Sequence, residues 1–166
     1  MTSAVGAATA TTLLVGMGES RLAGRAALLR TVGLGSCLAV IIFAPGQQLA
    51  ALAHCLLPTR PDDDPDPARY VDSAIPHLLA TLRAAGAREP FAATLVGGAS
   101  MFPGLTTGVA RDIAADNVAA ARAVLSNSAV PIRSEDVGGH VGRSVVADPV
   151  TQRVLVHTIR EGDRCL

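Results

Sequence analysis

The sequence predicts an α+β fold with mixed β-sheets and two main helices. Predicted strands outnumber predicted helices, and both helical segments fall in the middle of the chain instead of alternating with strands. The 166 residues favour one domain with enough material for a hydrophobic core. Because aromatic residues make up only 2% of the chain, alanine, valine and leucine must build that core.

Short apolar, often β-branched runs between turn residues indicate the strands. In chain order these runs are Thr12–Met17, Ala26–Val32, Leu38–Phe43, Leu49–Leu57, Ala92–Val96, Pro131–Arg133, Ser144–Ala147 and Val154–Ile159. The segment Arg21–Gly24 is interpreted as a connection, and Asp148–Gln152 as a hairpin turn between the last two strands. The run 38–43 is predicted to be a buried strand, although a buried helix also fits its short apolar pattern.

Two segments show helical spacing. In residues 70–85, apolar side chains recur at three- and four-residue intervals, and Gly86 ends the pattern. Pro76 is unsuited to a helix interior, so either the regular helix begins near Ser73 or it kinks at Pro76. An alanine-rich second helix is predicted from Asp112 to Leu125. Between strand and first helix, Thr59–Pro67 carries four Asp and three Pro and should be an exposed loop.

The composition narrows the possible functions. Fourteen basic and fourteen acidic residues argue against a nucleic-acid or anionic-membrane surface. Three irregularly spaced cysteines indicate reduced thiols and not a disulfide framework. No signal peptide and no membrane insertion are predicted, because no run approaches the roughly 20 apolar residues that span a bilayer. We expect a cytoplasmic protein with a disordered extension at residues 1–10 and a single domain at residues 11–166.

Cys37 and His54 are the main candidates for chemistry. Cys37 follows the glycine-rich turn Gly33–Ser36, and His54 ends the next apolar run. A thiol requires a base or a positive neighbour to react at neutral pH, so the two residues are predicted to form a thiolate–imidazolium pair. The turn at Gly35 and Ser36 would present backbone N–H groups as an oxyanion hole. The alternatives are a buried, inert thiol and a structural histidine at a strand end.

Two further residues, Thr31 and Cys55, lie close in sequence to the candidate pair Cys37 and His54. The Thr31 hydroxyl or carbonyl would hold the second imidazole nitrogen and fix its tautomer, unless Thr31 is an ordinary strand residue. Because strand side chains alternate, Cys55 should face away from His54, which argues against a metal site. Neither Gly16-x-Gly18 nor Gly33-x-Gly35 completes a dinucleotide-binding motif, so no cofactor is expected. Glu135 and Asp136 are interpreted as part of a solvated turn.

Several ordered segments resemble the chemoreceptor glutamine deamidase family, CheD. These segments are Val15–Glu19, Leu34–Val40, His54–Pro58, Tyr70–Ala74, Val96–Met101 and Glu135–Arg143. Together they extend over about residues 12–159. The segments are individually short, and their order and the spacing of Thr31, Cys37 and His54 make the set specific.

The resemblance implies a cysteine hydrolase that converts glutamine side chains of chemoreceptors to glutamate and ammonia. In this family the nucleophile falls on Cys37, the general base on His54 and the third triad member on Thr31. The implied fold is a mixed-sheet sandwich with helices, related to toxin deamidases. The implied partners are the cytoplasmic helices of chemoreceptors, as substrate, and the phosphatase CheC.

The chain departs from the family pattern in three places. Ala53 replaces the usual Asn before the histidine, and Thr94 replaces the usual Lys ahead of the Gly-Gly-Ala turn. The family segment Ile-Gly-x-Arg-Asn at the second helix keeps only Ile113 and Asn117.

Three alternatives to the chemoreceptor deamidase remain open from the sequence. The first is a catalytically silent module that binds a chemotaxis phosphatase or receptor. The second is a cysteine amidase or protein deamidase with a target outside chemotaxis. The third is a redox sensor that joins Cys37 to Cys55, which opposite strand faces make geometrically awkward. Rapid alkylation of Cys37 near neutral pH would separate a reactive nucleophile from an inert thiol.

Overall fold

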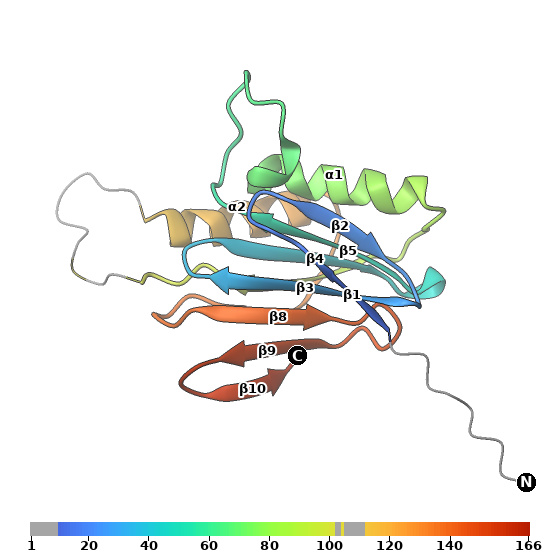
Figure 1. Cartoon of the computed structure of the whole chain (residues 1–166). Coiled ribbons are helices and arrows are strands. Elements are labelled where there is room, and N and C mark those ends of the chain that lie inside the picture. The colour runs from blue at the N-terminus through green and yellow to red at the C-terminus, as the bar shows by residue number, and fades with distance from the viewer. Residues whose placement is uncertain (1–9, 102–103, 105–111) are drawn as a thin grey trace, which may run out of the picture.

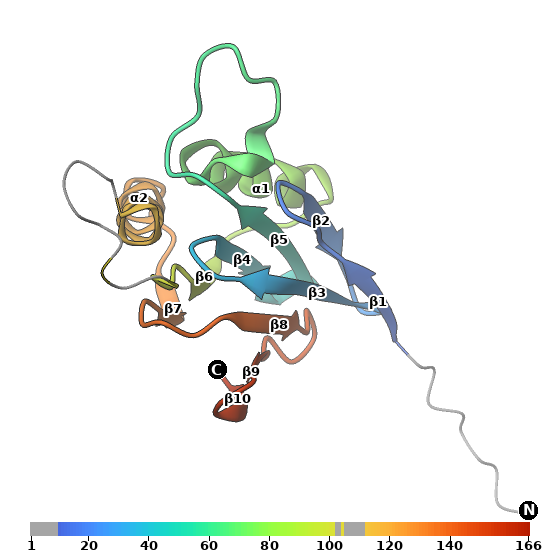
Figure 2. The same ribbon diagram turned by 60° about the vertical axis from the view of Figure 1, so that its left-hand side comes forward.

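The computed structural model describes residues 10–101, 104 and 112–166 and shows three layers (Figure 1). A five-stranded mixed sheet forms the middle layer, a second five-stranded mixed sheet covers one face, and two helices cover the other (Figure 2). The predicted α+β sandwich with two main helices is therefore confirmed. Of the predicted disordered extension 1–10, residues 1–9 lie outside the described part of the chain.

The middle sheet has the strand order β2-β5-β4-β6-β7. Its strands are β2 (Ser20–Ala23), β5 (Leu49–Cys55), β4 (Leu38–Ala44), β6 (Ala92–Gly97) and β7 (Ile132–Val137). Neighbouring strands run antiparallel except β6 and β7, which are parallel. All seven residues of β4 are buried. The predicted strand at residues 38–43 is confirmed, and its continuous apolar sequence follows from burial on both faces.

The outer sheet has the order β1-β3-β8-β9-β10. Its strands are β1 (Thr11–Leu14), β3 (Ala27–Leu34), β8 (Arg143–Ala147), β9 (Val154–Thr158) and β10 (Gly162–Cys165). Only β1 and β3 are parallel; the other neighbours are antiparallel, and residues 148–153 join β8 and β9 as the predicted hairpin.

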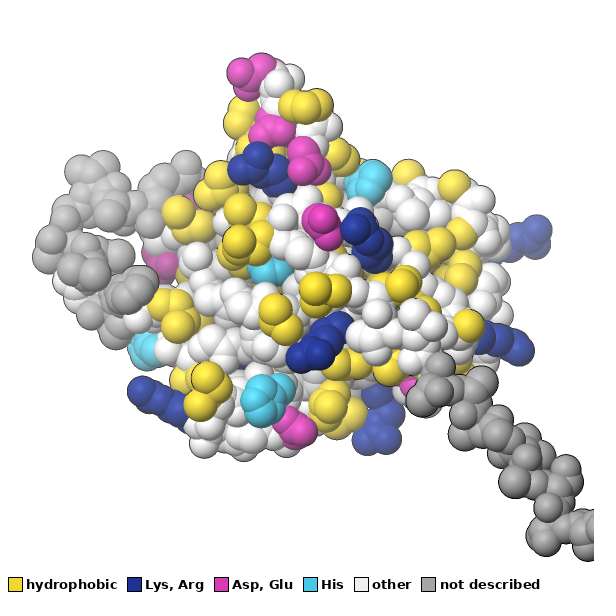
Figure 3. All heavy atoms as spheres, in the orientation of Figure 1, with side chains coloured by type: hydrophobic (Ala, Val, Ile, Leu, Met, Phe, Trp, Pro, Cys, Tyr) yellow, Lys and Arg dark blue, Asp and Glu magenta, His cyan; other side chains and the backbone are white. Residues whose placement is uncertain are grey.

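The helices are α1 (Val71–Ala84) and α2 (Ile113–Asn127), with short 3-10 turns at Pro45–Gln47 and Pro67–Arg69. Helix α1 begins at Val71 and contains Pro76, so a start near Ser73 is wrong. The segment Thr59–Pro67 is the predicted exposed loop and projects beside α1 (Figure 1). Acidic side chains gather at its tip (Figure 3).

Two hydrophobic cores lie on opposite faces of the middle sheet, and β4 contributes to both. Leu38, Val40 and Ile42 pack with the helices, whereas Ala39, Ile41 and Phe43 pack against the outer sheet. This alternation follows from the two-residue period of a strand. Burial of each large aliphatic side chain contributes about 1.5–3 kcal/mol, so both interfaces hold the layers firmly together.

Two edge strands and one longer strand differ from the sequence predictions. The predicted connection at Arg21–Gly24 lies largely in β2, and β10 was not predicted. Both are edge strands; β2 is mixed in burial and every residue of β10 is exposed, so neither shows a long apolar run. The strand predicted at 131–133 continues to Val137.

Candidate active site

The side chains of Thr31 and His54 meet between the two sheets. Thr31 lies on β3 of the outer sheet and His54 on β5 of the middle sheet, and both are fully buried. Thr31 Oγ1 lies 2.7 Å from His54 Nδ1. The same Oγ1 lies 2.7 Å from the carbonyl oxygen of Val15.

These two contacts determine the tautomer of the imidazole. The Val15 carbonyl can only accept, so the single O–H of Thr31 donates to it. The Thr31 oxygen then accepts a hydrogen bond, and Nδ1 of His54 must carry the donating proton. In the neutral ring this leaves a lone pair on Nε2. His54 Nε2 is buried and has no hydrogen-bond partner among the described residues.

The backbone of His54 is held by the segment before β2. Its N–H donates to the Glu19 carbonyl at 3.0 Å, and its carbonyl accepts from Gly18 N–H at 2.9 Å. The glycine pattern at residues 16–18, which does not fit a dinucleotide-binding motif, thus supports the strand that carries His54. A side chain at Gly18 would meet Arg69 Cγ at 2.8 Å, and its φ of +74° is unfavourable for other residues.

Cys37 lies in the bend one residue before β4, at the end of the β4–β5 ladder to which His54 belongs. Leu38 pairs with Cys55 and Ala39 with His54. Extending this register by one residue puts Cys37 opposite Leu56 and on the same face as Ala39 and His54. The half-buried Cys37 packs against the core between the sheets.

Cys55 faces the opposite side, as its strand position predicts. It is buried in the core between the middle sheet and the helices. Burial raises the pKa of the Cys55 thiol far above its ordinary range. Cys37, Cys55 and Cys165 are all free thiols. Among residues 10–101, 104 and 112–166, no group of three His, Cys, Asp or Glu side chains could hold a metal ion.

Burial favours the neutral forms of Cys37 and His54. It raises the pKa of the Cys37 thiol, an effect that the backbone N–H of Cys37 partly offsets. It lowers the pKa of His54, because the charged imidazolium loses hydration. Burial therefore opposes the charged forms of both groups, and the predicted thiolate–imidazolium pair stays a prediction.

The glycine turn after β6 supports the backbone of Cys37. Gly98 N–H donates to the Cys37 carbonyl at 2.8 Å, and Ala99 N–H donates to the Gly35 carbonyl at 2.7 Å. At Gly97, φ is +117° and an added Cβ would lie 2.3 Å from the Cys37 carbonyl oxygen. Only glycine fits this approach, which explains the Gly-Gly pair in the sequence.

Comparison with known proteins identifies the family. The family model described as CheD chemotactic sensory transduction matches residues 56–158. The chain is 34% identical over 154 residues to the chemoreceptor glutamine deamidase CheD of Halalkalibacterium halodurans, covering 90% of this chain and 95% of that protein. It is 36% identical over 152 residues to the probable chemoreceptor glutamine deamidase CheD of Archaeoglobus fulgidus, covering 91% and 96%. This chain belongs to the CheD family.

A third relative is matched over its whole length. The probable chemoreceptor glutamine deamidase CheD of Methanosarcina barkeri is 34% identical over 155 residues, which cover 92% of this chain and 100% of that protein. The match to the family model begins just after His54 and so takes in α1, α2 and the strands β6 to β9. Among the described residues of this CheD chain, no helix has the length and apolar character needed to cross a bilayer.

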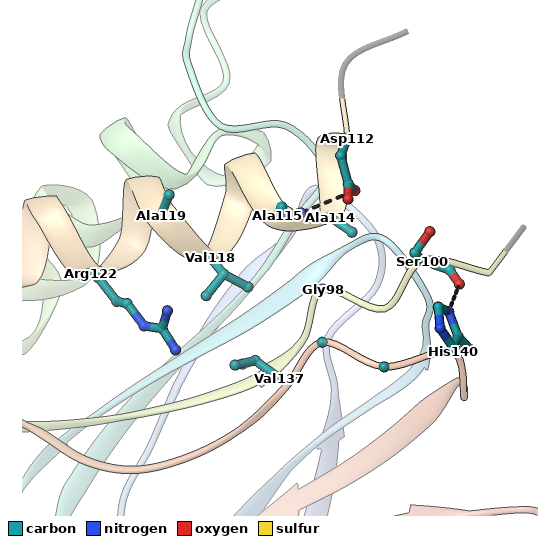
Figure 4. Close-up of a pocket in the computed structure, with 12 residues that line it drawn as sticks. Gly98, Ser100, Asp112, Ala114, Ala115, Val118, Ala119, Arg122, Val137 and His140 are labelled. Atoms are coloured by element: carbon teal, nitrogen blue, oxygen red, sulfur yellow. Dashed lines mark hydrogen bonds between the residues drawn. The ribbon is translucent and has the colours of Figure 1, made fainter. Parts of the chain in front are cut away.

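Two surface hollows lie beside the glycine turns of the CheD site. The first, of about 460 Å³, lies between α2 and the turns at Gly98–Ser100 and Gly138–His140. Figure 4 shows Val118 and Arg122 of α2 projecting toward Val137 on the other wall. The second, of about 450 Å³, extends from Gly33 and Met101 to Ile159. Met101 Cγ lies 3.0 Å from where a Cβ on Gly35 would stand, so Met101 covers the bend before Cys37.

The turn at Gly138–Gly139 is anchored by a buried ion pair. Arg143 Nη2 lies 3.0 Å from Asp136 Oδ1, and both side chains are almost completely buried. Arg164 of β10 contacts the other Asp136 oxygen. Although burial opposes ionisation, hydrogen bonds from the two guanidinium groups leave the pKa of Asp136 below its ordinary value. The interpretation of Asp136 as a solvated-turn residue is therefore wrong, because it lies within β7 and is buried.

The predicted residues take different places in this site. Thr31 contacts His54 directly, and Cys37 lies just beyond the end of the ladder between the strand of His54 and β4. Gly35 and Ser36 form the bend before Cys37, where Gly35 N–H donates to the Gly33 carbonyl at 3.1 Å. The Val15 carbonyl and the side chain of Asn117 were not singled out as site groups. Val15 acts through its backbone, which carries no sequence signal, and Asn117 lies 81 residues from its partner Ser36.

Proposed function

We propose that this CheD chain is a cysteine-dependent protein-glutamine deamidase that acts on chemoreceptors in chemotaxis signalling. The observation that carries the proposal is the buried Val15–Thr31–His54 chain of hydrogen bonds, which leaves Nε2 as the base on the face that Cys37 shares. The relatives named chemoreceptor glutamine deamidase CheD supply the substrate class.

In the first stage, Cys37 Sγ attacks the Cδ atom of a glutamine side chain while its proton passes to His54 Nε2. A tetrahedral intermediate forms, and the resulting imidazolium, stabilised by its Nδ1–H bond to Thr31, donates that proton to the leaving nitrogen. Ammonia departs and a thioester joins Cys37 to the former glutamine.

In the second stage, water attacks the thioester carbonyl and His54 Nε2 takes its proton. The carbon–sulfur bond breaks, the proton returns to the sulfur, and the receptor leaves with a glutamate side chain in place of the glutamine. Backbone N–H groups of the Gly35–Ser36 turn are assigned to the developing oxyanion. Because Gly35 N–H already donates to Gly33, an oxyanion would have to compete with that bond for this amide.

Three exposed apolar side chains lie next to segments that carry or support this triad and fit a helical receptor surface. Met17 is 69% exposed next to the Gly18 that supports His54, and Met101 is 43% exposed over Gly35. Leu57, three residues after His54, is 37% exposed. Flexible methionine side chains adapt to helical surfaces of varied sequence. We assign this apolar rim to binding of the cytoplasmic helices of chemoreceptors. We also propose that a CheC-like phosphatase is a partner and that the protein acts in the cytoplasm.

The test is the mass of a chemoreceptor cytoplasmic fragment after incubation with the wild-type protein or with Cys37→Ala. Each deamidated glutamine adds about 1 Da through the amide-to-carboxylate conversion. A gain with wild type and none with Cys37→Ala supports the proposal. Equal gains with both proteins would contradict a Cys37 nucleophile. No gain with either, together with an unreactive Cys37, would favour a silent binding module.

A further inference from the structure

Asn117 of α2 connects the segment carrying the nucleophile to the strand carrying the base. Its side chain is fully buried. The Nδ2 group donates to the Ser36 carbonyl at 3.0 Å and to the Leu56 carbonyl at 3.1 Å. Ser36 directly precedes Cys37, and Leu56 follows His54 by two positions.

The amide orientation follows from these partners. Both are carbonyl oxygens, which can only accept, and Nδ2 has two hydrogens to give. A rotated amide would place Oδ1 against two acceptors. Each N–H therefore serves one carbonyl, and the Asn117 side chain acts as a two-pronged donor.

The contacts lie where the β4–β5 ladder ends. The last pair of the ladder is Leu38 with Cys55, so Ser36 and Leu56 lie beyond it. The Asn117 amide bridges their carbonyls from the helix side and continues the connection between the two segments. This arrangement fixes the separation of the Cys37 bend and the His54 strand end.

The sequence of α2 supports a specific role for this side chain. The other buried residues of α2 are Ala114, Val118, Ala121 and Leu125, all apolar. Asparagine is a weak helix former, and a buried amide is unfavourable unless it is hydrogen-bonded. An apolar residue here would suit both helix and core, but would leave two carbonyls beside the site without this donor.

We propose that Asn117 is a positioning residue for the deamidation reaction, holding the Cys37 bend against the His54 strand. The inference rests on the proposed function. It assigns Asn117 no contact with the substrate; the side chain acts through the backbone on either side of the catalytic pair.

The test compares Asn117→Ala and Asn117→Asp with Leu125→Ala, a buried control in the same helix. Kinetics on a receptor fragment are measured well below each unfolding midpoint. We expect Asn117→Ala to lower kcat about 10- to 100-fold with KM within about twofold, because small displacements of reacting groups cost this much. Leu125→Ala should lose stability and keep kcat within about twofold.

Asn117→Asp keeps the shape of the side chain but turns a carboxylate oxygen toward two carbonyl acceptors. Its kcat relative to wild type should rise as pH falls, because a protonated carboxyl can again donate one hydrogen bond. A readout independent of receptor is the alkylation rate of Cys37 by iodoacetamide. It should fall in both Asn117 variants and stay unchanged in Leu125→Ala.

The outcomes separate this inference from the proposed function. Wild-type protein that fails to deamidate the receptor fragment contradicts the proposed function. If the wild type is active, two results would overturn the positioning role. One is that Asn117→Ala keeps its kcat and its alkylation rate; the other is that Leu125→Ala loses as much of both as Asn117→Ala does. Failure of both Asn117 variants to fold, with Leu125→Ala folded, would also overturn it by showing a purely structural role.

Discussion

The Thr31 hydroxyl oxygen lies 2.7 Å from His54 Nδ1 and joins one β-sheet of the sandwich to the other. Through its own O–H it also binds the Val15 carbonyl. One hydroxyl thereby orients the imidazole, selects its tautomer and leaves Nε2 without a proton. The proposed catalytic base is therefore held across the core between the sheets, where both partners are buried.

Thr31→Val tests this orientation directly. Valine keeps the β-branched shape but removes the hydroxyl, so His54 Nδ1–H and the Val15 carbonyl lose their partner. We expect kcat to fall about 10- to 100-fold through the misoriented base. Stability should fall by about 1–3 kcal/mol for buried groups left unpaired. Thr31→Ser, which keeps the hydroxyl, should recover most of the kcat; equal losses in both variants would contradict the role of the hydroxyl.

The pH dependence of Cys37 alkylation tests whether Cys37 and His54 are both uncharged before the reaction. Burial raises the pKa of this thiol, so its thiolate fraction should keep increasing through the mildly alkaline range. The rate with iodoacetamide, measured by mass spectrometry on the Cys37 peptide, should rise from pH 7 to pH 9 without a plateau. A rate that is already constant around neutral pH would show a thiolate–imidazolium pair instead.

Gly97→Ala tests the close approach of the glycine turn to the nucleophile. A Cβ there would stand 2.3 Å from the Cys37 carbonyl oxygen, at a φ of +117°. We expect a loss of about 1–3 kcal/mol from backbone strain and a lower kcat as the Cys37 bend shifts. The matched control is Gly46→Ala, where an added Cβ meets nothing within 4 Å. Denaturant unfolding that gave equal stabilities for the two variants would contradict this account.

Burial of His54 predicts that the stability of the fold depends on pH. Burial lowers the pKa of His54, so between its ordinary pKa of about 6.5 and its lower folded pKa the unfolded chain binds a proton that the native state does not. The free energy of unfolding should fall as pH falls through this window, with a slope from His54 of at most about 1.4 kcal/mol per pH unit. Urea unfolding of His54→Gln should show a smaller slope; an unchanged slope would refute a depressed pKa.

Much of the fold was predictable because its buried elements have clear periodicity. β4 is apolar throughout because both its faces are covered, and α1 shows helical spacing because one side packs on the sheet. The edge strands β2 and β10 lack such patterns. Burial of Asp136 was also missed, because its partner Arg164 comes from β10, and a distant ion pair leaves no local signal.

The site was only partly predictable for a related reason. Thr31, Cys37 and His54 were identified by residue type, spacing and family resemblance. The pKa shifts of Cys37 and His54 depend on burial, which brings desolvation that the local sequence does not report. The role of Asn117 depends on contacts with Ser36 and Leu56, which are 81 and 61 residues away. Only the packing of α2 against the sheet brings these groups together.

The most direct test of the central claim is the nitrogen NMR spectrum of His54 in the wild-type protein, assigned by comparison with His54→Gln. We predict a neutral ring at pH 7 with the proton on Nδ1 and a bare Nε2, and loss of the single tautomer in Thr31→Val. A proton on Nε2, or an imidazolium at pH 7, would contradict the claim that Thr31 presents His54 as the base for Cys37.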